Sequence, residues 1–246
     1  MGEIDDYIRA RDEQVRDNLN NQPLAEAVYD FTRQLVNSNY VKNFTWMDIP
    51  ILQYPSDLMV MQEIIFKIVP DVIIETGVAF GGMTNFYASV LKSLGRYDAT
   101  VFAIDKEIRE HTRQIVATSP FRSYITLIES DSADENVVRQ IEPACIPGDT
   151  VLVSLDSNHT HEHVLKELRL YSELVSVDSY IVVFDTAIEF FGHLDKNQDR
   201  PWGKGNNPYT ATQEFLKEND SFIADKEVEQ RALFTSAPGG WLRRIK

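Results

Sequence analysis

The fold is decided by one stretch of sequence, Val72-Ile73-Ile74-Glu75-Thr76-Gly77-Val78-Ala79-Phe80-Gly81-Gly82. Its first five residues are dominated by β-formers, and the segment after it, residues 84–94, carries apolar side chains at helical spacing. Glycines between the two let the backbone turn tightly and approach a ligand, and a helix N-terminus presents free N–H groups. The stretch therefore predicts a strand, a ligand-binding turn and a helix.

The same alternation continues along the chain. Further β-rich runs are predicted as strands at residues 100–105, 125–129, 150–156 and 180–185, in addition to 72–76. Amphipathic segments between them are predicted as helices at 84–94, 107–118, 133–141 and 162–175. Strands that are apolar on both faces and are each followed by a helix predict an α/β fold, a Rossmann-like doubly wound, mostly parallel sheet.

Both ends of the chain add further elements. Apolar stripes predict two N-terminal helices: Ile4, Ile8, Val15 and Leu19, then Leu24, Ala27, Val28, Phe31 and Leu35. Ser56 or Asp57 is expected to cap a third helix that ends before Pro70. We thus predict an N-terminal helical extension over residues 1–55 and a catalytic domain over 56–246. After the parallel strands we predict a polar loop (190–208), a helix (210–219) and a closing strand pair (222–228, then 233–236 completed by 241–245).

Composition excludes several classes of protein. With 246 residues, 43% of them hydrophobic, the chain can bury one large core. Its formal charge of −14 repels a phosphate backbone and an anionic bilayer, so neither nucleic acid nor membrane is an expected partner. The single cysteine, Cys145, forms no internal disulfide, and the first residues hold no apolar run of signal-peptide length. These features predict a cytoplasmic protein.

The glycine spacing indicates which ligand the first turn binds. The pattern is Gly77-x-x-x-Gly81-Gly82, with Glu75 and Thr76 before it, rather than the Gly-x-Gly-x-x-Gly of pyrophosphate-binding turns. An acid two residues before the first glycine favours S-adenosylmethionine. A tight turn without a ligand is the structural alternative.

Acids at the following strand ends extend the predicted cofactor site. Asp105 ends the second strand, where a carboxylate can accept both ribose hydroxyl protons, although an acid can also occur there by chance. Asp131 and Ser132 follow the third strand and could hold the adenine edge. Either residue could instead cap the next helix.

Two aspartates end the fourth and fifth strands. Asp156 and Asp185 should face the crevice beside the glycine turn, where paired carboxylates can hold Mg²⁺. Such a metal would polarise an acceptor hydroxyl, and His159 is the candidate base. His161 and His163 are expected to be exposed and solvated, the alternative being a transition metal held by Asp156, His159 and His163.

A longer set of motifs resembles the cephalosporin hydroxylase family, which is related to macrolide sugar O-methyltransferases. The resemblance is carried by 74–77 with Gly81-Gly82, by 155–159 with His163, and above all by Arg200-Pro201-Trp202-Gly203-Lys204-Gly205-Asn206-Asn207-Pro208. It runs from about Trp46 onward and implies a class I methyltransferase fold that uses S-adenosylmethionine and Mg²⁺.

The resemblance also implies residue roles. Asp156 and Asp185 match metal ligands and His159 matches a proposed base, but Phe184 stands where the family pattern has an acid, which weakens the expectation of Mg²⁺. The loop that holds Trp202, Asn206, Asn207 and Tyr209 is expected to meet the acceptor, or else to be structural.

Three functional hypotheses follow. The first is a methyltransferase that acts on a hydroxyl of a small molecule, such as a sugar or glycosylated metabolite. The second is an oxidative enzyme of the hydroxylase type, and the third is a nucleoside-binding relative that has lost its chemistry. The helical N-terminal arm makes a homo-oligomer plausible.

Overall fold

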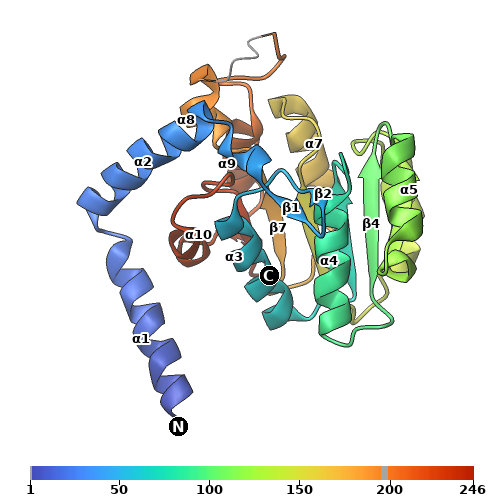
Figure 1. The fold of residues 1–246 in the computed structure, drawn as a ribbon, viewed down its shortest axis with the longest axis horizontal. Coiled ribbons are helices and arrows are strands. Elements are labelled where there is room, and N and C mark those ends of the chain that lie inside the picture. The colour runs from blue at the N-terminus through green and yellow to red at the C-terminus, as the bar shows by residue number, and fades with distance from the viewer. Residues whose placement is uncertain (1, 195–198) are drawn as a thin grey trace.

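In the computed structural model, which describes residues 2–194 and 199–246, the chain forms a seven-stranded sheet with helices on both faces (Figure 1). The strands are β3 (Val72–Thr76), β4 (Thr100–Asp105), β5 (Ile125–Glu129), β6 (Val151–Leu155), β7 (Tyr180–Val183), β8 (Phe222–Ala224) and β9 (Trp241–Arg244). Their order is β5-β4-β3-β6-β7-β9-β8. The chain runs outward from β3 to β5 and then returns to β6 on the other side of β3. A topological switch point therefore lies between β3 and β6, where open α/β sheets bind ligands.

The five strands from β3 to β7 are parallel, which confirms the predicted sheet. Their bounds match the prediction at β3, β4 and β5, while β6 and β7 are one or two residues shorter at their ends. The central strands β3 and β6 are buried at every residue, as an apolar run flanked by helices requires.

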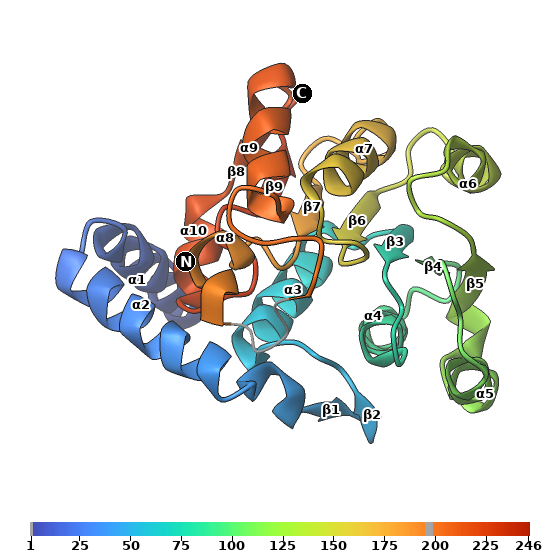
Figure 2. The ribbon, with the colours of Figure 1, turned by 90° about the horizontal axis from the view of Figure 1, so that it is seen from above.

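Helices cover both faces of the sheet (Figure 2). One face carries α3 (Pro55–Ile68), α4 (Gly82–Ser93), α5 (Glu110–Thr118) and α10 (Lys226–Ala232); the other carries α6 (Glu135–Ile141), α7 (His161–Tyr171) and α9 (Pro208–Glu218). Because successive side chains of a strand point to opposite faces, Ile73 packs into the core under α3 and α4, and Ile74 into the core under α7 and α9.

The N-terminal region forms the two predicted helices, α1 (Glu3–Asn18) and α2 (Gln22–Asn37). They are followed by η1 (Tyr40–Asn43) and by the hairpin of β1 (Thr45–Trp46) and β2 (Ile49–Pro50). Helix α1 buries none of its residues and runs along one side of the molecule (Figure 1). It contacts α10, where Arg16 lies 3.6 Å from Glu227. The apolar stripe of α1 is therefore largely exposed.

The predicted closing strand pair is wrong in part. Only 222–224 and 241–244 are strands, since residues 226–232 form helix α10 with Asp225 as its N-cap, and residues 233–236 form no strand. The polar loop predicted at 190–208 begins with the end of α8 (Ile188–Phe191) and with η4 (Gly192–Leu194), and residues 195–198 lie outside the described part of the chain. The remaining short helices are η2 (Arg122–Tyr124) and η3 (Glu142–Ala144).

Two predicted helix caps are also wrong. Helix α3 begins at Pro55 with Tyr54 as its N-cap, so Ser56 and Asp57 lie inside its first turn. Helix α6 is capped by Asp134, whose side chain accepts from the N–H of Asn136, rather than by Asp131 or Ser132. Ser56 Oγ instead donates to the carbonyl of Phe234, and Ser132 Oγ lies 3.1 Å from His163 Nε2. Within residues 2–194 and 199–246, we find no helix that combines the length and apolar character needed to cross a bilayer.

Candidate active site

The glycine turn brings the end of β3 against the end of β6. Gly77 has a φ of +90°, and a Cβ at this position would lie 2.0 Å from the carbonyl oxygen of Asp156. The N–H of Asp156 in turn donates to the carbonyl of Thr76 at 2.9 Å. A Cβ at Gly82 would lie 2.3 Å from the carbonyl oxygen of Pro50. Both glycines are therefore needed for close backbone packing, and both also line the cavity described below.

Glu75, Thr76 and Gly81 lie beneath the turn rather than in the cavity. Glu75 is 2% exposed, and its carboxyl group accepts from Thr84 Oγ1 at 2.5 Å. Burial raises the pKa of Glu75 to about 8. Gly81, with a φ of +84°, precedes α4, and its carbonyl accepts from Asn85 Nδ2. These residues shape the turn and do not line the cavity, and their predicted part in cofactor binding stays a prediction.

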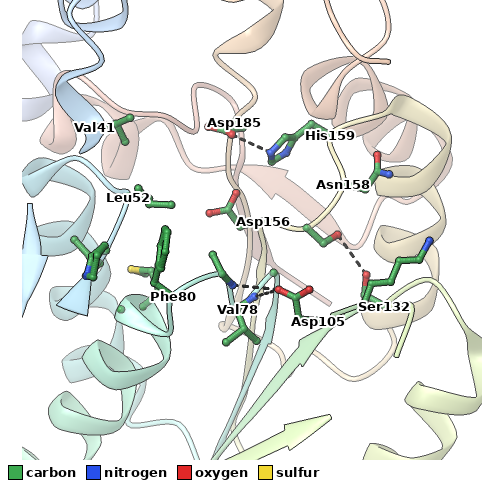
Figure 3. A pocket seen from close by; sticks show the side chains of 18 of the residues that line it. Val41, Leu52, Val78, Phe80, Asp105, Ser132, Asp156, Asn158, His159 and Asp185 are labelled. Carbon is green, nitrogen blue, oxygen red and sulfur yellow. Dashed lines mark hydrogen bonds and ion pairs between the residues drawn. The ribbon is translucent and has the colours of Figure 1, made fainter. Parts of the chain in front are cut away.

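Asp105 holds the turn from the neighbouring strand (Figure 3). Its Oδ2 accepts from the N–H groups of Val78 at 2.9 Å and Ala79 at 3.1 Å, and its Oδ1 accepts from Glu107 N at 3.0 Å. Each carboxylate oxygen has two lone pairs, so Asp105 keeps acceptor capacity on its cavity side. Because Oδ2 already accepts two hydrogen bonds and Oδ1 one, the carboxylate has room for one ribose hydroxyl rather than for both.

A cavity of about 550 Å³ lies over the switch point, at the C-terminal ends of the parallel strands. Of the predicted site residues, it is lined by Gly77, Gly82, Asp105, Asp131, Ser132, Asp156, His159, Asp185 and Trp202. Its size falls in the range of cofactor pockets, about 300–1,000 Å³. Val78, Phe80 and Ile51 add apolar surface on which a planar base can pack. A nucleoside cofactor fits this lining.

Three potential metal ligands meet at one side of the cavity (Figure 3). Asp156, His159 and Asp185 each offer an atom within 4.8 Å of the others. Burial raises the pKa of Asp156 well above its usual value, and the charges of Asp185 and Glu75 raise it further. In the described part of the chain no lysine or arginine pairs with either aspartate. A divalent cation would offset this like-charge repulsion, and carboxylate oxygens are the ligands that Mg²⁺ prefers.

His159 lies against Asp185 and Trp202. Its Nε2 is 3.2 Å from Asp185 Oδ2, and its ring meets the Trp202 ring edge-on at 4.9 Å. His159 can serve as a base or as a third metal ligand, but one ring nitrogen cannot do both at once. The alternative transition-metal site of Asp156, His159 and His163 is not formed. The third potential ligand beside Asp156 and His159 is Asp185. One histidine with two carboxylates also differs from the two-histidine iron site of oxygenases.

The expectation that His161 and His163 are exposed and solvated is wrong. His161 Nε2 lies 3.3 Å from Glu214, on α9. His163 Nε2 lies 3.1 Å from Ser132 Oγ and 3.6 Å from the fully buried Glu167. Burial lowers the pKa of His163, but its hydrogen bond to Glu167 and the charge of that residue raise it above the usual value. His163 thus supports the cavity wall at Ser132.

Sequence reasoning missed Gln53, which holds Asp156 from behind. Gln53 is 2% exposed; its Nε2 donates to Asp156 Oδ2 at 3.0 Å, and its Oε1 accepts from Ser236 Oγ at 3.2 Å. The backbone N–H of Ser236 donates to Asp57 Oδ2 at 2.9 Å, and burial raises the pKa of Asp57 to about 6. No spacing in the sequence marks Gln53, because the segment between β2 and α3 reaches β6 only through tertiary packing.

The position that carries an acid in the family pattern points into the core. Phe184 is 1% exposed and meets Trp241 edge-on, with ring centroids 6.0 Å apart. It is absent from the cavity lining. A carboxylate in this rotamer would be buried among apolar side chains, so the metal ligands available in the cavity are Asp156, His159 and Asp185.

The predicted acceptor loop contributes Trp202 to the cavity, whereas the other three residues make structural contacts. Asn206 Oδ1 accepts from His161 N at 2.9 Å. Asn207 is fully buried and caps α9. Tyr209 meets Phe190 edge-on at 5.0 Å. Of the four residues predicted to meet the acceptor, Trp202 is therefore the one that lines the cavity.

Comparison with known proteins connects this geometry to a family. The family described as Rhamnosyl O-methyltransferase/CmcI matches residues 38–245. A rhamnosyl O-methyltransferase of Mycobacterium bovis is 30% identical over 210 residues, which cover 81% of this chain and 78% of that protein. A rhamnosyl O-methyltransferase of Mycobacterium leprae is 31% identical over 213 residues, 84% of this chain and 86% of that protein.

Solved structures of CmcI share the fold. CmcI with Mg and SAM aligns with a TM-score of 0.57 and 17% identity, over 83% of this chain and 78% of that one. CmcI with SAH aligns with a TM-score of 0.57 and 18% identity, over 83% and 84% of the two chains. These similarities confirm the predicted class I methyltransferase fold.

Proposed function

The chain belongs to the rhamnosyl O-methyltransferase/CmcI family, and on this basis we propose that it is an S-adenosylmethionine-dependent O-methyltransferase. The acceptor is a hydroxyl group of a sugar or of a glycosylated small molecule, as the names of its relatives suggest. One observation carries the proposal. The glycine turn, the Asp105 carboxylate and the cluster of Asp156, His159 and Asp185 line a single cavity.

Each of these residues has a distinct role in the proposal. Asp105 accepts a ribose hydroxyl proton through Oδ1, and Asp156 with Asp185 holds a cation. The imidazole of His159 accepts the proton of the acceptor hydroxyl, or occupies the third ligand position if a metal alone activates that hydroxyl. When bound, S-adenosylmethionine supplies an electrophilic methyl group, and Mg²⁺ lowers the pKa of a coordinated hydroxyl.

The chain's own contribution is chiefly alignment. The Gly77 turn and Asp105 fix the cofactor end of the cavity, and Trp202 restricts the opposite side beside His159. Holding oxygen, methyl carbon and sulfur in line converts an encounter of two molecules into a step within one complex. A pre-formed cavity therefore provides most of the rate acceleration.

Calorimetric titration of the purified chain with S-adenosylmethionine tests the first step. We expect a single binding site, weakened by Asp105→Asn, because the amide side chain accepts at only one of its two positions. His159→Ala and Asp156→Ala should abolish methyl transfer to a rhamnoside while cofactor binding persists, which argues against a relative that has lost its chemistry. Absence of cofactor binding in the unmodified chain would refute the proposal.

A further inference from the structure

A second cavity of about 390 Å³ lies beside the first. The two cavities share Val41, Lys42, Asp185, Arg200 and Trp202 as lining residues. Asp185 and Trp202, the two contacts of His159, thus separate the proposed cofactor site from a second space on their other side. A molecule in that space would reach the proposed metal site from the side opposite the cofactor.

One part of the wall of the second cavity is apolar. Leu35 from α2 and Phe191 from α8 are 7% and 6% exposed, and Ile188 and Leu194 lie beside them in the lining. Tyr29 backs this wall, with its ring 4.9 Å from that of Phe191. The wall suits the non-polar surface of a ligand larger than a single sugar.

The charged side chains of the lining are mainly basic. Lys42, Arg200 and Lys204 line the cavity, and Asp185 is the one acidic residue in its described lining. Within the described part of the chain, Lys42 and Lys204 form no salt bridge. Arg200 lies over the Trp202 ring at 5.2 Å. In a chain with a formal charge of −14, this concentration of positive charge is local.

From this lining we infer that the second cavity binds the acceptor, and that the acceptor carries an anionic group, a phosphate or a carboxylate, beside an apolar body. The inference rests on the proposed function. The hydroxyl to be methylated faces Asp185 and His159, and the anion lies among Lys42, Arg200 and Lys204. A cation held by Asp185 would offset the one negative charge in the lining and strengthen the attraction.

Three glucosides that differ only at carbon 6 provide the test. The probes are 4-nitrophenyl glucoside, its 6-phosphate, and 4-nitrophenyl glucuronide, which share the aromatic body and the pyranose ring. Each is titrated by calorimetry into the full chain saturated with S-adenosylhomocysteine and Mg²⁺. We expect one or both anionic probes to bind at least about tenfold more tightly than the neutral probe, and the difference to shrink as salt rises from about 50 to about 500 mM.

The two anionic probes distinguish the two sources of the charge. Tighter binding of the phosphate identifies a phosphorylated acceptor, and tighter binding of the glucuronide identifies a carboxylate. Equal or tighter binding of the neutral glucoside overturns the inference, as does failure of both anions to bind at about 5 mM, where even millimolar affinity is measurable.

Matched variants locate the anion. Lys42→Gln and Lys204→Gln should each weaken binding of the anionic probe about three- to tenfold and leave the neutral probe unchanged, since each removes one charged donor. Lys217→Gln, an exposed site in the last turn of α9, is the control and should change neither. Unchanged anion binding in both cavity variants overturns the assignment.

Binding of S-adenosylhomocysteine, which is measured before the probes are titrated, distinguishes failure of one proposal from failure of the other. If S-adenosylhomocysteine fails to bind, the methyltransferase proposal fails. If it binds and the anions do not bind more tightly than the neutral glucoside, only the inference about the acceptor fails.

Discussion

Gln53 is a single side chain whose effect on the site can be measured apart from the methyl acceptor. It fixes one oxygen of Asp156 through a 3.0 Å hydrogen bond. In Gln53→Ala we expect Mn²⁺, used as a spectroscopic substitute for Mg²⁺, to bind about ten- to hundredfold more weakly, because a hydrogen bond to a charged group contributes about 1.5–3 kcal/mol. Methyl transfer should fall by a similar factor.

The control for Gln53 is Gln140→Ala, an exposed residue of α6 away from the cavity. Electron paramagnetic resonance of bound Mn²⁺ gives the affinity of each variant. If Gln53→Ala lowers thermal stability but leaves Mn²⁺ affinity and its spectrum as in Gln140→Ala, Gln53 is structural and does not position Asp156.

Glu75 should make the stability of the chain depend on pH. Its pKa rises from an ordinary 4.5 to about 8 on folding, because burial disfavours the charged carboxylate. Between these values the folded state binds more protons than the unfolded state, so the free energy of unfolding falls as pH rises through this window. Glu75→Gln keeps an acceptor for Thr84. It should make the decrease in unfolding free energy across this pH range smaller by roughly 2–4 kcal/mol.

Urea denaturation at a series of pH values between about 5 and 8 measures the effect of Glu75. Glu110→Gln, an exposed site in the first turn of α5, is the control. The same slope of unfolding free energy against pH in Glu75→Gln as in the unmodified chain contradicts the assignment.

The site residues at strand ends could be predicted from the sequence, whereas the side chains that hydrogen-bond to residues of the cavity could not. Asp105, Asp156 and Asp185 follow apolar runs, and the ends of parallel strands meet at one edge of a sheet. Gln53 and Glu167 come from a loop and from a helix interior, and only the packed structure brings them to the cavity. The expected exposure of His163 failed for the same reason, since Ser132 and Glu167 reach it from other elements.

The junction of β3 and α4 depends on a glycine that no other residue can replace. In Gly77→Ala the new Cβ meets the backbone of Asp156 at 2.0 Å, in addition to the cost of a φ of +90°. Strain of this kind costs about 1–3 kcal/mol per residue, and the clash must displace β6 or the turn as well. We expect the free energy of unfolding to fall by more than about 3 kcal/mol and cofactor binding to be lost.

The variant Gly148→Ala measures the cost of backbone strain at a glycine where an added Cβ meets no other atom. Its φ is +101°, but no atom lies within 4 Å of the added Cβ. Only the backbone cost of about 1 kcal/mol should remain there. Equal destabilisation of the two variants, measured by urea denaturation, would show that contact with β6 does not matter.

At the level of elements, periodicity predicted the parallel strands and their helices well, because their apolar runs are buried on both faces. It failed after residue 224. Phe222-Ile223-Ala224 is a strand, but Lys226 to Ala232 are mostly good helix formers behind an Asp225 cap, and the predicted strand was extended through them. The strand partner 241–244 was expected only as the end of a longer strand.

For the whole molecule, the exposed apolar side chains of α1 predict self-association. Ile4 is 75% exposed and Tyr7 is 72% exposed. Ile4→Glu with Tyr7→Glu should shift the chain to a smaller species in size-exclusion chromatography with light scattering, because charges in an apolar contact are costly to bury. Tyr97→Glu, at an 80% exposed site, is the control. A monomer in every case, or no shift in the double variant, would contradict the prediction.

The overall architecture could be predicted from patterning and resemblance together, but the placement of the N-terminal segment could not. Ile51 is 4% exposed in the core, and Gln53 supports the site, although both precede the boundary predicted at residue 55. The division into residues 1–55 and 56–246 stays a prediction. Sequence patterns specify which residues of a segment are apolar, whereas its neighbours follow from the packed structure.

The position of β9 has a consequence for how the protein forms in the cell. It lies between β7 and β8, and Trp241 and Leu242 are 1% and 0% exposed on its two faces. Until β9 has been synthesised, the nascent chain therefore has an open sheet edge at β7. The cores on the two faces of the sheet also lack Trp241 and Leu242 until then. Ribosome-bound intermediates that stop earlier should be substrates for chaperones.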